Sequence, residues 1–449
     1  MDANIRRRFL LAEEKVPKAL ILLAIPSIIA MLTNAIYNFV DALFVGMLKN
    51  TAMIAAVTVS LPMVMIMSAI GQGIGIGAGS LISRQLGRKE DEQVKKTVYT
   101  AMIMVFAFSI LGMVVLIPNL DQILPWFGAT EDAMLYATRY AMWMIIGMAS
   151  TILNMTINNM LRAEGDVKFP MIAIMIGAVL NIFLDPIFMF DWGFGLQLEG
   201  AAIATIVSQL ISSVILLNRL LRTKTSIQWK PLEYNFSLPF AKEIFALGIA
   251  LFFRQALVSF SMLFINNAAA SIGTELVASI GLAMRTIMIV NFVLIGYAQG
   301  FQPFAGYNYG ARRFDRVHDA LSISIRWSTV FLVFSSLFMV LFSAQIMALF
   351  NAEPDVVYYG RRMFYAVSIS LPFMGYYQMY MVLMQSLGKA KEAFFLSVAR
   401  QGIFFIPMIL ILPRVFSYNG ILAAQPAADL LTVALTFFFS VRLKKDIQI

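Results

Sequence analysis

The chain of 449 residues contains no cysteine and a single histidine, His318. It can therefore form no disulfide, no thiolate metal site and no cysteine nucleophile, and it cannot surround a metal with several histidines. The sequence also lacks a phosphate-binding glycine loop and a Ser/His/Asp set in a recognisable arrangement. We therefore expect neither an enzymatic activity nor a cofactor.

Charged residues are scarce as well, at 13% of the chain, whereas soluble domains contain about 25%. Hydrophobic residues make up 60% of the chain, and the mean hydropathy is +0.79. These values predict an all-α polytopic membrane protein, because helices satisfy their own backbone hydrogen bonds in lipid. The net charge of +9 does not indicate nucleic-acid binding, since the basic residues lie in short loops between apolar runs.

Apolar runs of about 20 residues, the length of a bilayer crossing, occur twelve times in the sequence. The predicted transmembrane helices cover residues 17–47, 53–83, 97–118, 135–159, 169–190, 200–221, 240–272, 276–308, 318–342, 360–385, 392–413 and 420–441. Lysine and arginine concentrate in alternate loops, among them the N-terminal tail, 84–96 and 219–242. The positive-inside rule then places both termini in the cytoplasm of a multi-pass cell-membrane protein. We expect no cleavable signal peptide, because the first apolar run is too long.

The two halves of the chain repeat one another. Three pairs of residues in loops far apart share an offset of 223, namely Gly87 with Gly310, Gly165 with Gly388 and Lys168 with Lys391. This offset indicates a duplicated six-helix unit. We predict an N-terminal lobe over 1–221, a cytoplasmic linker over 222–239 and a C-terminal lobe over 240–449, related by pseudo-symmetry about the membrane normal.

Asp41 lies in the middle of the first apolar run, on the same helical face as Asn34, Tyr37 and Asn38. In the fifth run, Asp185 follows Asn181 by one helical turn. A carboxylate at bilayer depth is costly and is usually retained for a partner or a water-filled cavity. Two such groups close together would share a proton or a cation.

Each of these polar residues also has a structural interpretation. Asp41 could hydrogen-bond a neighbouring span, and Asp185 could cap a kink at Pro186. Asn154 and Asn158 share a face of the fourth run and could join helices or contact a substrate. The glycines between 71 and 79 predict close helix packing, and we expect an ion pair between Arg400 and Asp429 in the second half.

Several segments resemble the multidrug and toxic compound extrusion family, over nearly the whole chain. They are 37-YNFVDALFVG-46, 71-GQGIGIGAGSLISRQLGR-88, 161-LRAEGDVKFP-170, 181-NIFLDPIFMF-190, 200-GAAIAT-205 and 299-QGFQPFAGYNYGAR-312. The likeness is greatest to the prokaryotic DNA-damage-inducible branch. It implies a cleft between two lobes and cation-coupled export of amphipathic, mostly cationic compounds.

The resemblance also implies a site in the N-terminal lobe. Its cation- or proton-binding residues would be Asp41, Asn181, Asp185 and Thr205. Sodium would suit this set if the amide and hydroxyl oxygens complete its shell. Pro26, Tyr37, Asn154 and Asn158 would surround the site, and the first span would bend at Pro26 when the acid is protonated. The second lobe does not repeat the acid, because Phe264 stands 223 residues after Asp41.

Three functions follow as alternatives. The first is a secondary multidrug exporter that exchanges H⁺ or Na⁺ for amphipathic cations by alternating access. The second is a lipid-linked saccharide flippase of the same superfamily, and the third is a membrane receptor or scaffold without transport. We expect small-molecule substrates, a lipid bilayer as the surroundings, no nucleic acid, and a monomer.

Overall fold

The computed structural model describes residues 3–222, 226–230, 233–350 and 353–447. Within these ranges the chain is helical and contains no strand. The first half contains α1 (Ala3–Ala12), α2 (Val16–Met47), α3 (Thr51–Gly87), α4 (Asp91–Leu116), α5 (Leu120–Trp126), α6 (Glu131–Ile146), α7 (Met148–Ala163), α8 (Lys168–Met189) and α9 (Gln197–Arg222). The second half contains α10 (Leu238–Ala270), α11 (Thr274–Gly310), α12 (Phe314–Leu341), α13 (Ser343–Phe350), α14 (Pro354–Ser370), α15 (Met374–Ser386), α16 (Ala390–Val398), α17 (Ile406–Phe416) and α18 (Tyr418–Ile447).

The predicted spans correspond to these helices with two breaks. In the described part of the chain, ten helices are long and apolar enough to cross a membrane, and α6 with α7 forms an eleventh that is bent by 46°. The bend falls at Gly147, where a Cβ would collide with Ile206 of α9. The predicted span 360–385 is divided between α14 and α15 by a 3-10 turn, Leu371–Phe373, that contains Pro372. Proline cannot donate the backbone hydrogen bond that would continue the helix.

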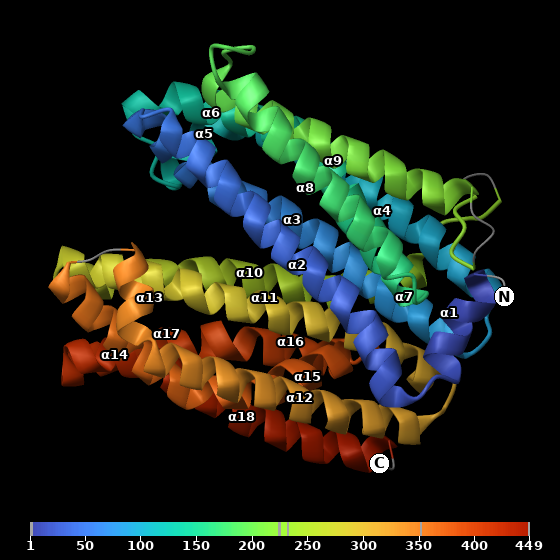
Figure 1. Ribbon diagram of the computed structural model, residues 1–449. Helices are drawn as coiled ribbons and strands as arrows, with labels where there is room; N and C mark the ends of the chain where they lie inside the picture. The colour runs from blue at the N-terminus through green and yellow to red at the C-terminus, as the bar shows by residue number, and fades with distance from the viewer. Residues whose placement is uncertain (1–2, 223–225, 231–232, 351–352, 448–449) are drawn as a thin grey trace.

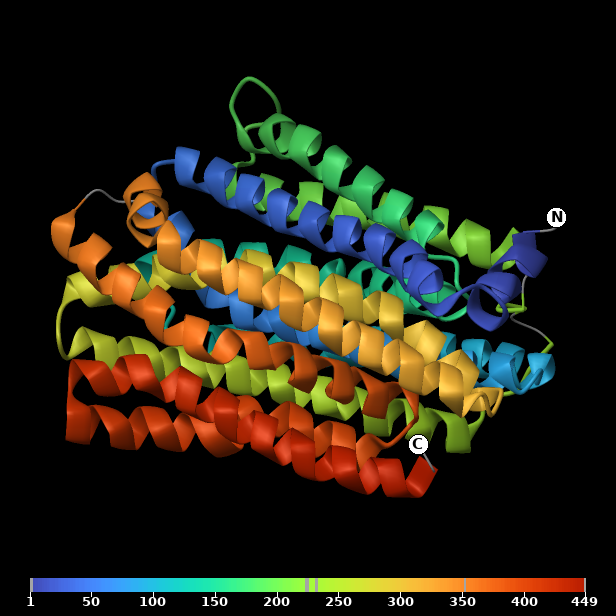
Figure 2. The same cartoon turned by 60° about the horizontal axis from the view of Figure 1, so that its bottom comes forward.

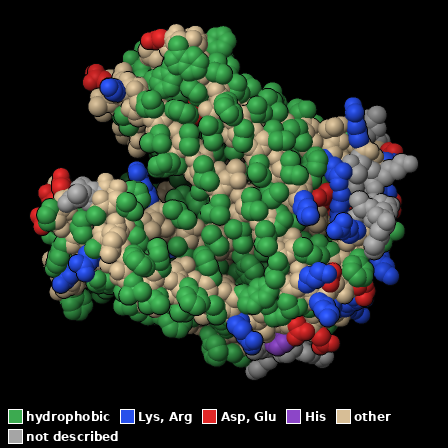
Figure 3. Space-filling view, viewed as in Figure 1, with side chains coloured by type: hydrophobic (Ala, Val, Ile, Leu, Met, Phe, Trp, Pro, Cys, Tyr) green, Lys and Arg blue, Asp and Glu red, His purple; other side chains and the backbone are tan. Residues whose placement is uncertain are grey.

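The helices form two lobes that converge at one end of the molecule and separate at the other (Figure 1). Helices α2 to α9 form one lobe and α10 to α18 the other, and the turned view shows both sets running along the same long axis (Figure 2). Both termini lie at the end where the lobes converge. At the opposite end the surface is hollowed between the lobes (Figure 3). The predicted boundaries of the lobes and linker stay predictions; residues 223–225 and 231–232 of that linker lie outside the described ranges.

Two crossed helix contacts join the lobes, and glycines permit both. A Cβ on Gly73 of α3 would lie 3.1 Å from Gly248 Cα of α10. A Cβ on Gly296 of α11 would lie 2.6 Å from Ile28 Cα of α2. Because Gly73 and Gly296 are 223 residues apart, the two contacts are equivalent, and small residues let the backbones approach closely. The predicted packing role of the glycine run fits this arrangement.

These contacts correct one detail of the predicted repeat. Gly248 and Ile28 occupy equivalent places, and 248 − 28 gives an offset of 220 for the first helix of each half. The structural counterpart of Asp41 is therefore Ser261, not Phe264. The difference arises because the loops that follow these helices differ in length, so one offset cannot serve every helix.

The N-terminal helix α1 contacts both lobes where they converge. Arg7 is buried and pairs with Glu164 at 3.1 Å and with Asp166 at 2.7 Å, in the loop between α7 and α8. On the other lobe, Asn308 Nδ2 donates to the carbonyl of Leu11 at 3.0 Å. Burial raises the pKa of Glu164 to about 7, although Arg7 opposes the shift. The sequence analysis predicted a tail here, whereas the structure shows a helix that bridges the lobes.

Candidate functional site

The polar cluster begins on α8. Asn181 and Asp185 are buried, with 2% and 0% of their surfaces exposed, and Asn181 Nδ2 donates to Asp185 Oδ1 at 3.0 Å. The same amide lies 3.3 Å from Thr205 Oγ1 on α9. Helix α8 runs through Pro186 to Met189, so Asp185 stands one turn before the helix ends. Three of the four predicted ligands are thus joined by hydrogen bonds.

Asp41 approaches this cluster from α2, which packs against α8. It lies close enough to Asp185 for a direct electrostatic interaction between the carboxylates. Tyr37 and the buried Tyr140 of α6 are within electrostatic range of both acids. Tyr140 was not identified from the sequence, because a single tyrosine in an apolar span carries no distinguishing pattern.

The donor set can be tested for its fit to a cation. Asp41 Oδ1, Asn181 Oδ1 and Asp185 Oδ2 are buried and accept no hydrogen bond within the described part of the protein. Three oxygens with unused lone pairs suit a hard cation, and a proton shared between two carboxylates would serve equally. The described residues contain no group of three or more His, Cys, Asp or Glu that could hold a metal. The arrangement therefore fits Na⁺ or H⁺ better than a transition metal.

A cavity of about 300 Å³ adjoins the cluster inside the first lobe. Its lining includes seven of the predicted residues, namely Asn34, Tyr37, Asn38, Asn154, Asn158, Asn181 and Thr205. A chain of hydrogen bonds fixes one wall: Asn158 Nδ2 donates to Asn154 Oδ1 at 2.6 Å, and Asn154 Nδ2 donates to Ser212 Oγ at 2.8 Å. The amide and hydroxyl lining is suited to a hydrated or polar group rather than to lipid.

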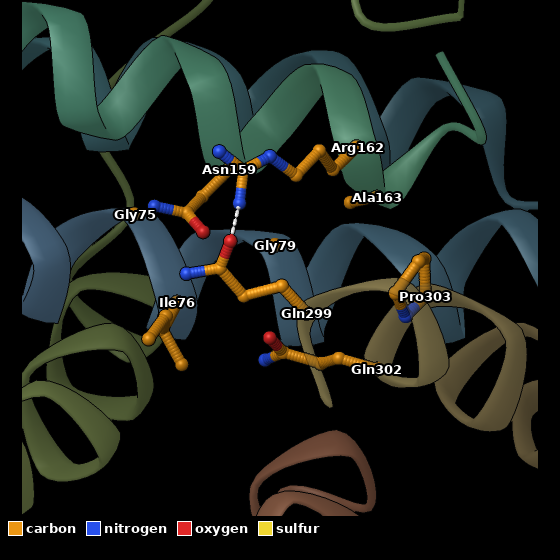
Figure 4. A pocket seen from close by; sticks show the side chains of 9 residues that line it. All are labelled: Gly75, Ile76, Gly79, Asn159, Arg162, Ala163, Gln299, Gln302 and Pro303. Carbon is orange, nitrogen blue, oxygen red and sulfur yellow. Dashed lines mark hydrogen bonds between the residues drawn. The ribbon is translucent and has the colours of Figure 1, made fainter. Parts of the chain in front are cut away.

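The lobes also meet beneath this cavity. Arg162 of α7 lines the cavity and donates to Gln299 Oε1 of α11, across the lobe boundary (Figure 4). Gln302 lies beside them, and its Nε2 is buried without a hydrogen-bond partner in the described structure. Sequence reasoning missed this contact because 137 residues separate Arg162 from Gln299.

Pro26 does not line the cavity. It is buried in α2, which continues through it without a break. Ala24 and Ile28 on either side of it contact Gly300 and Gly296 of α11. Pro26 therefore lies within the contact between the lobes, where a bend of α2 would change how they pack.

The second lobe contains a buried ion pair instead of a pair of acids. Arg400 Nε lies 2.8 Å from Asp429 Oδ1, as the sequence analysis expected. Ser370 and Gln425 also donate to this carboxylate, at 3.0 and 2.7 Å. Arg400 stands in a π-helical segment, Ala399–Phe405, between α16 and α17. The acidic site is thus confined to one lobe.

Comparisons with known proteins agree with this architecture. The multidrug export protein MepA of Staphylococcus aureus (strain MSSA476) is 27% identical over 444 residues, covering 96% of each chain. The MepA protein of Staphylococcus haemolyticus (strain JCSC1435) is 25% identical, covering 98% of this chain and 97% of its own. These relatives are named as export proteins, not as enzymes.

A solved structure described as the outward-facing conformation of a multidrug resistance MATE family transporter of the MOP superfamily superimposes with a TM-score of 0.92. It is 23% identical, covers 99% of this chain and 98% of its own, and so shows the same fold. The model of the MatE family matches residues 26–187 and again 250–411, once in each half. The chain is therefore a multi-pass membrane protein that belongs to the MatE family of transporters.

Proposed function

We propose that the protein is a secondary multidrug exporter that couples the entry of H⁺ or Na⁺ to the expulsion of amphipathic, mostly cationic compounds. The observation that carries the proposal is the cluster of Asp41 and Asp185, which stands beside a polar cavity in one lobe. The export proteins among its relatives support the same direction of transport.

The chemistry of coupling follows from the two carboxylates. Both cannot remain ionised at close range without a large electrostatic cost, so a proton or a sodium ion between them is stabilised. Asn181 orients Asp185 and leaves its own Oδ1 free toward a cation. A bound cation and a cationic substrate would compete for the same negative charge, which is the simplest form of antiport.

The geometry also supports alternating access. The lobes are separated at the end away from the termini and are joined at the other by pairs such as Arg84 with Glu243, at 2.6 Å. If the termini are cytoplasmic, as the distribution of basic residues predicts, this form is open to the outside of the cell membrane. Rotation of the lobes about the crossed glycine contacts would then open the opposite side. We propose that a monomer suffices, because one chain contains both lobes.

Flux in liposomes tests the proposal. The purified protein is reconstituted, a fluorescent amphipathic cation is supplied, and a pH gradient or a sodium gradient is imposed separately. We expect one of the two gradients to drive dye movement and the dye in turn to release the corresponding ion. Movement of a lipid-linked saccharide without ion flux would favour the flippase, and no flux of either kind would favour a receptor or scaffold.

A further inference from the structure

A second cavity lies away from the polar cluster, on the outer side of the contact between α3 and α10. It has a volume of about 330 Å³, near the lower end for ligand pockets, and every residue in its lining is apolar or glycine. Phe108 of α4 and Phe245 of α10 stack at its wall with ring centroids 6.4 Å apart. Phe245 and Phe252 are 49% and 37% exposed, so the groove opens toward the membrane.

The other half of the chain provides an internal comparison. Helices α4 and α12 begin 223 residues apart, at Asp91 and Phe314, so their registers can be matched. Met104 and Ile74 line the groove, and their counterparts are Trp327 and Tyr297.

Those two rings meet edge to face with centroids 6.4 Å apart, and Tyr297 also donates to Ser324 Oγ at 3.0 Å. At the helix contact itself, Gly248 of the groove corresponds to Ile28. Larger side chains thus occupy in one half the space that stays open in the other.

The charge at the mouth of the groove differs between the halves in the same way. Lys96 stands two helical turns before Met104 on the same face of α4, about 12 Å away along the helix axis. Its Nζ lies 6.0 Å from the centre of the Phe240 ring of α10 and forms no ion pair with a described residue. The counterpart of Lys96 in the filled half is Asp319. An apolar slot with a lysine at its mouth matches a hydrocarbon chain that ends in an anionic head.

We propose that this groove binds one acyl chain of an anionic phospholipid from the leaflet on the side of the termini, with its phosphate at Lys96. The site depends on the membrane location of the protein and not on the proposed export function. A lipid held there would contact α3, α4 and α10, and so would touch both lobes at their junction.

Native mass spectrometry of the delipidated protein provides the binding test. Phosphatidylglycerol and phosphatidylcholine with identical acyl chains are titrated separately, and we expect the anionic lipid to bind more tightly. Lys96→Asp, which places the counterpart's charge at the mouth, should weaken phosphatidylglycerol binding roughly 10- to 30-fold and leave phosphatidylcholine nearly unchanged. Lys168→Asp, an exposed lysine at the start of α8, is the matched control and should have little effect.

Filling the groove tests the acyl chain. The double variant Ile74→Tyr with Met104→Trp introduces the side chains of the other half and should weaken both lipids by about tenfold or more. Phe106→Trp, on the exposed face of α4, serves as its control. A phosphatidylglycerol with a photoreactive group in its acyl chain should label peptides that contain Met104 and Phe245 in the wild type.

Labelling spread evenly over all lipid-facing helices would overturn the proposal, as would unchanged binding in both Lys96→Asp and the filled variant. The Lys96 variant alters a side chain at the surface, so the test does not depend on whether the filled variant folds.

Discussion

The link between Arg7 and Glu164 allows a prediction in which pH reports on a single buried pair. Arg7→Ala removes the guanidinium that contacts both Glu164 and Asp166. Breaking a buried ion pair by removing one partner typically costs about 3–5 kcal/mol, because the other charge remains buried. Asp166 keeps a second partner, Arg219, at 2.9 Å, so the loss falls mainly on Glu164.

The sign of the pH dependence follows from the raised pKa of Glu164. A carboxyl group with a folded pKa of about 7 and an unfolded value of 4.5 stabilises the fold when protonated, and that contribution is lost as pH rises through 7. The difference corresponds to about 3 kcal/mol at alkaline pH. Without Arg7 the folded pKa rises further, so the variant's Glu164 is neutral at pH 6 but strained at pH 8.

We therefore expect Arg7→Ala to destabilise the protein by about 1 kcal/mol at pH 6, the value of a lost hydrogen bond, and by about 3 kcal/mol or more at pH 8. Thermal unfolding in detergent, followed by tryptophan fluorescence, measures the difference. Arg6→Ala changes an exposed arginine of the same helix and is the control. In an Arg7→Ala/Glu164→Gln background the pH dependence should disappear. An equal loss at pH 6 and pH 8 in Arg7→Ala would refute the reasoning.

Three further predictions concern the transport cycle and the second lobe. Asp41→Asn should abolish ion-coupled export while the purified protein elutes and unfolds like the wild type; full transport with unchanged ion dependence would remove Asp41 from the site. Distances between spin labels on α2 and α9 should change between high and low pH, and Pro26→Ala should suppress that change; constant distances in the wild type together with normal transport by Pro26→Ala would exclude bending of α2. Asp429→Ala should lower the free energy of unfolding by about 3 kcal/mol, because Arg400 would lose its buried partner, whereas the exposed Asp121→Ala should change it little.

The fold could be predicted from the sequence because its determinants are local. Runs of apolar residues mark the spans, and the repeated glycines at 87 and 310 mark the duplication. Asp41, Asn181 and Asp185 were identifiable because a carboxylate in an apolar run is costly wherever the helix packs. Tyr140 and the Arg162–Gln299 contact were not, since their significance depends on which helices become neighbours. The break at Gly147 likewise depends on Ile206, 59 residues further along the chain.

The crossed glycine contacts bear on how such a chain could arise. Each half contributes its first helix to one contact and its glycine-bearing second helix to the other. A six-helix half therefore carries both members of the contact and could pair with a copy of itself about a two-fold axis. A homodimer of halves is thus a feasible ancestor, and fusion of its genes would have freed one copy to lose the acids that the other retained.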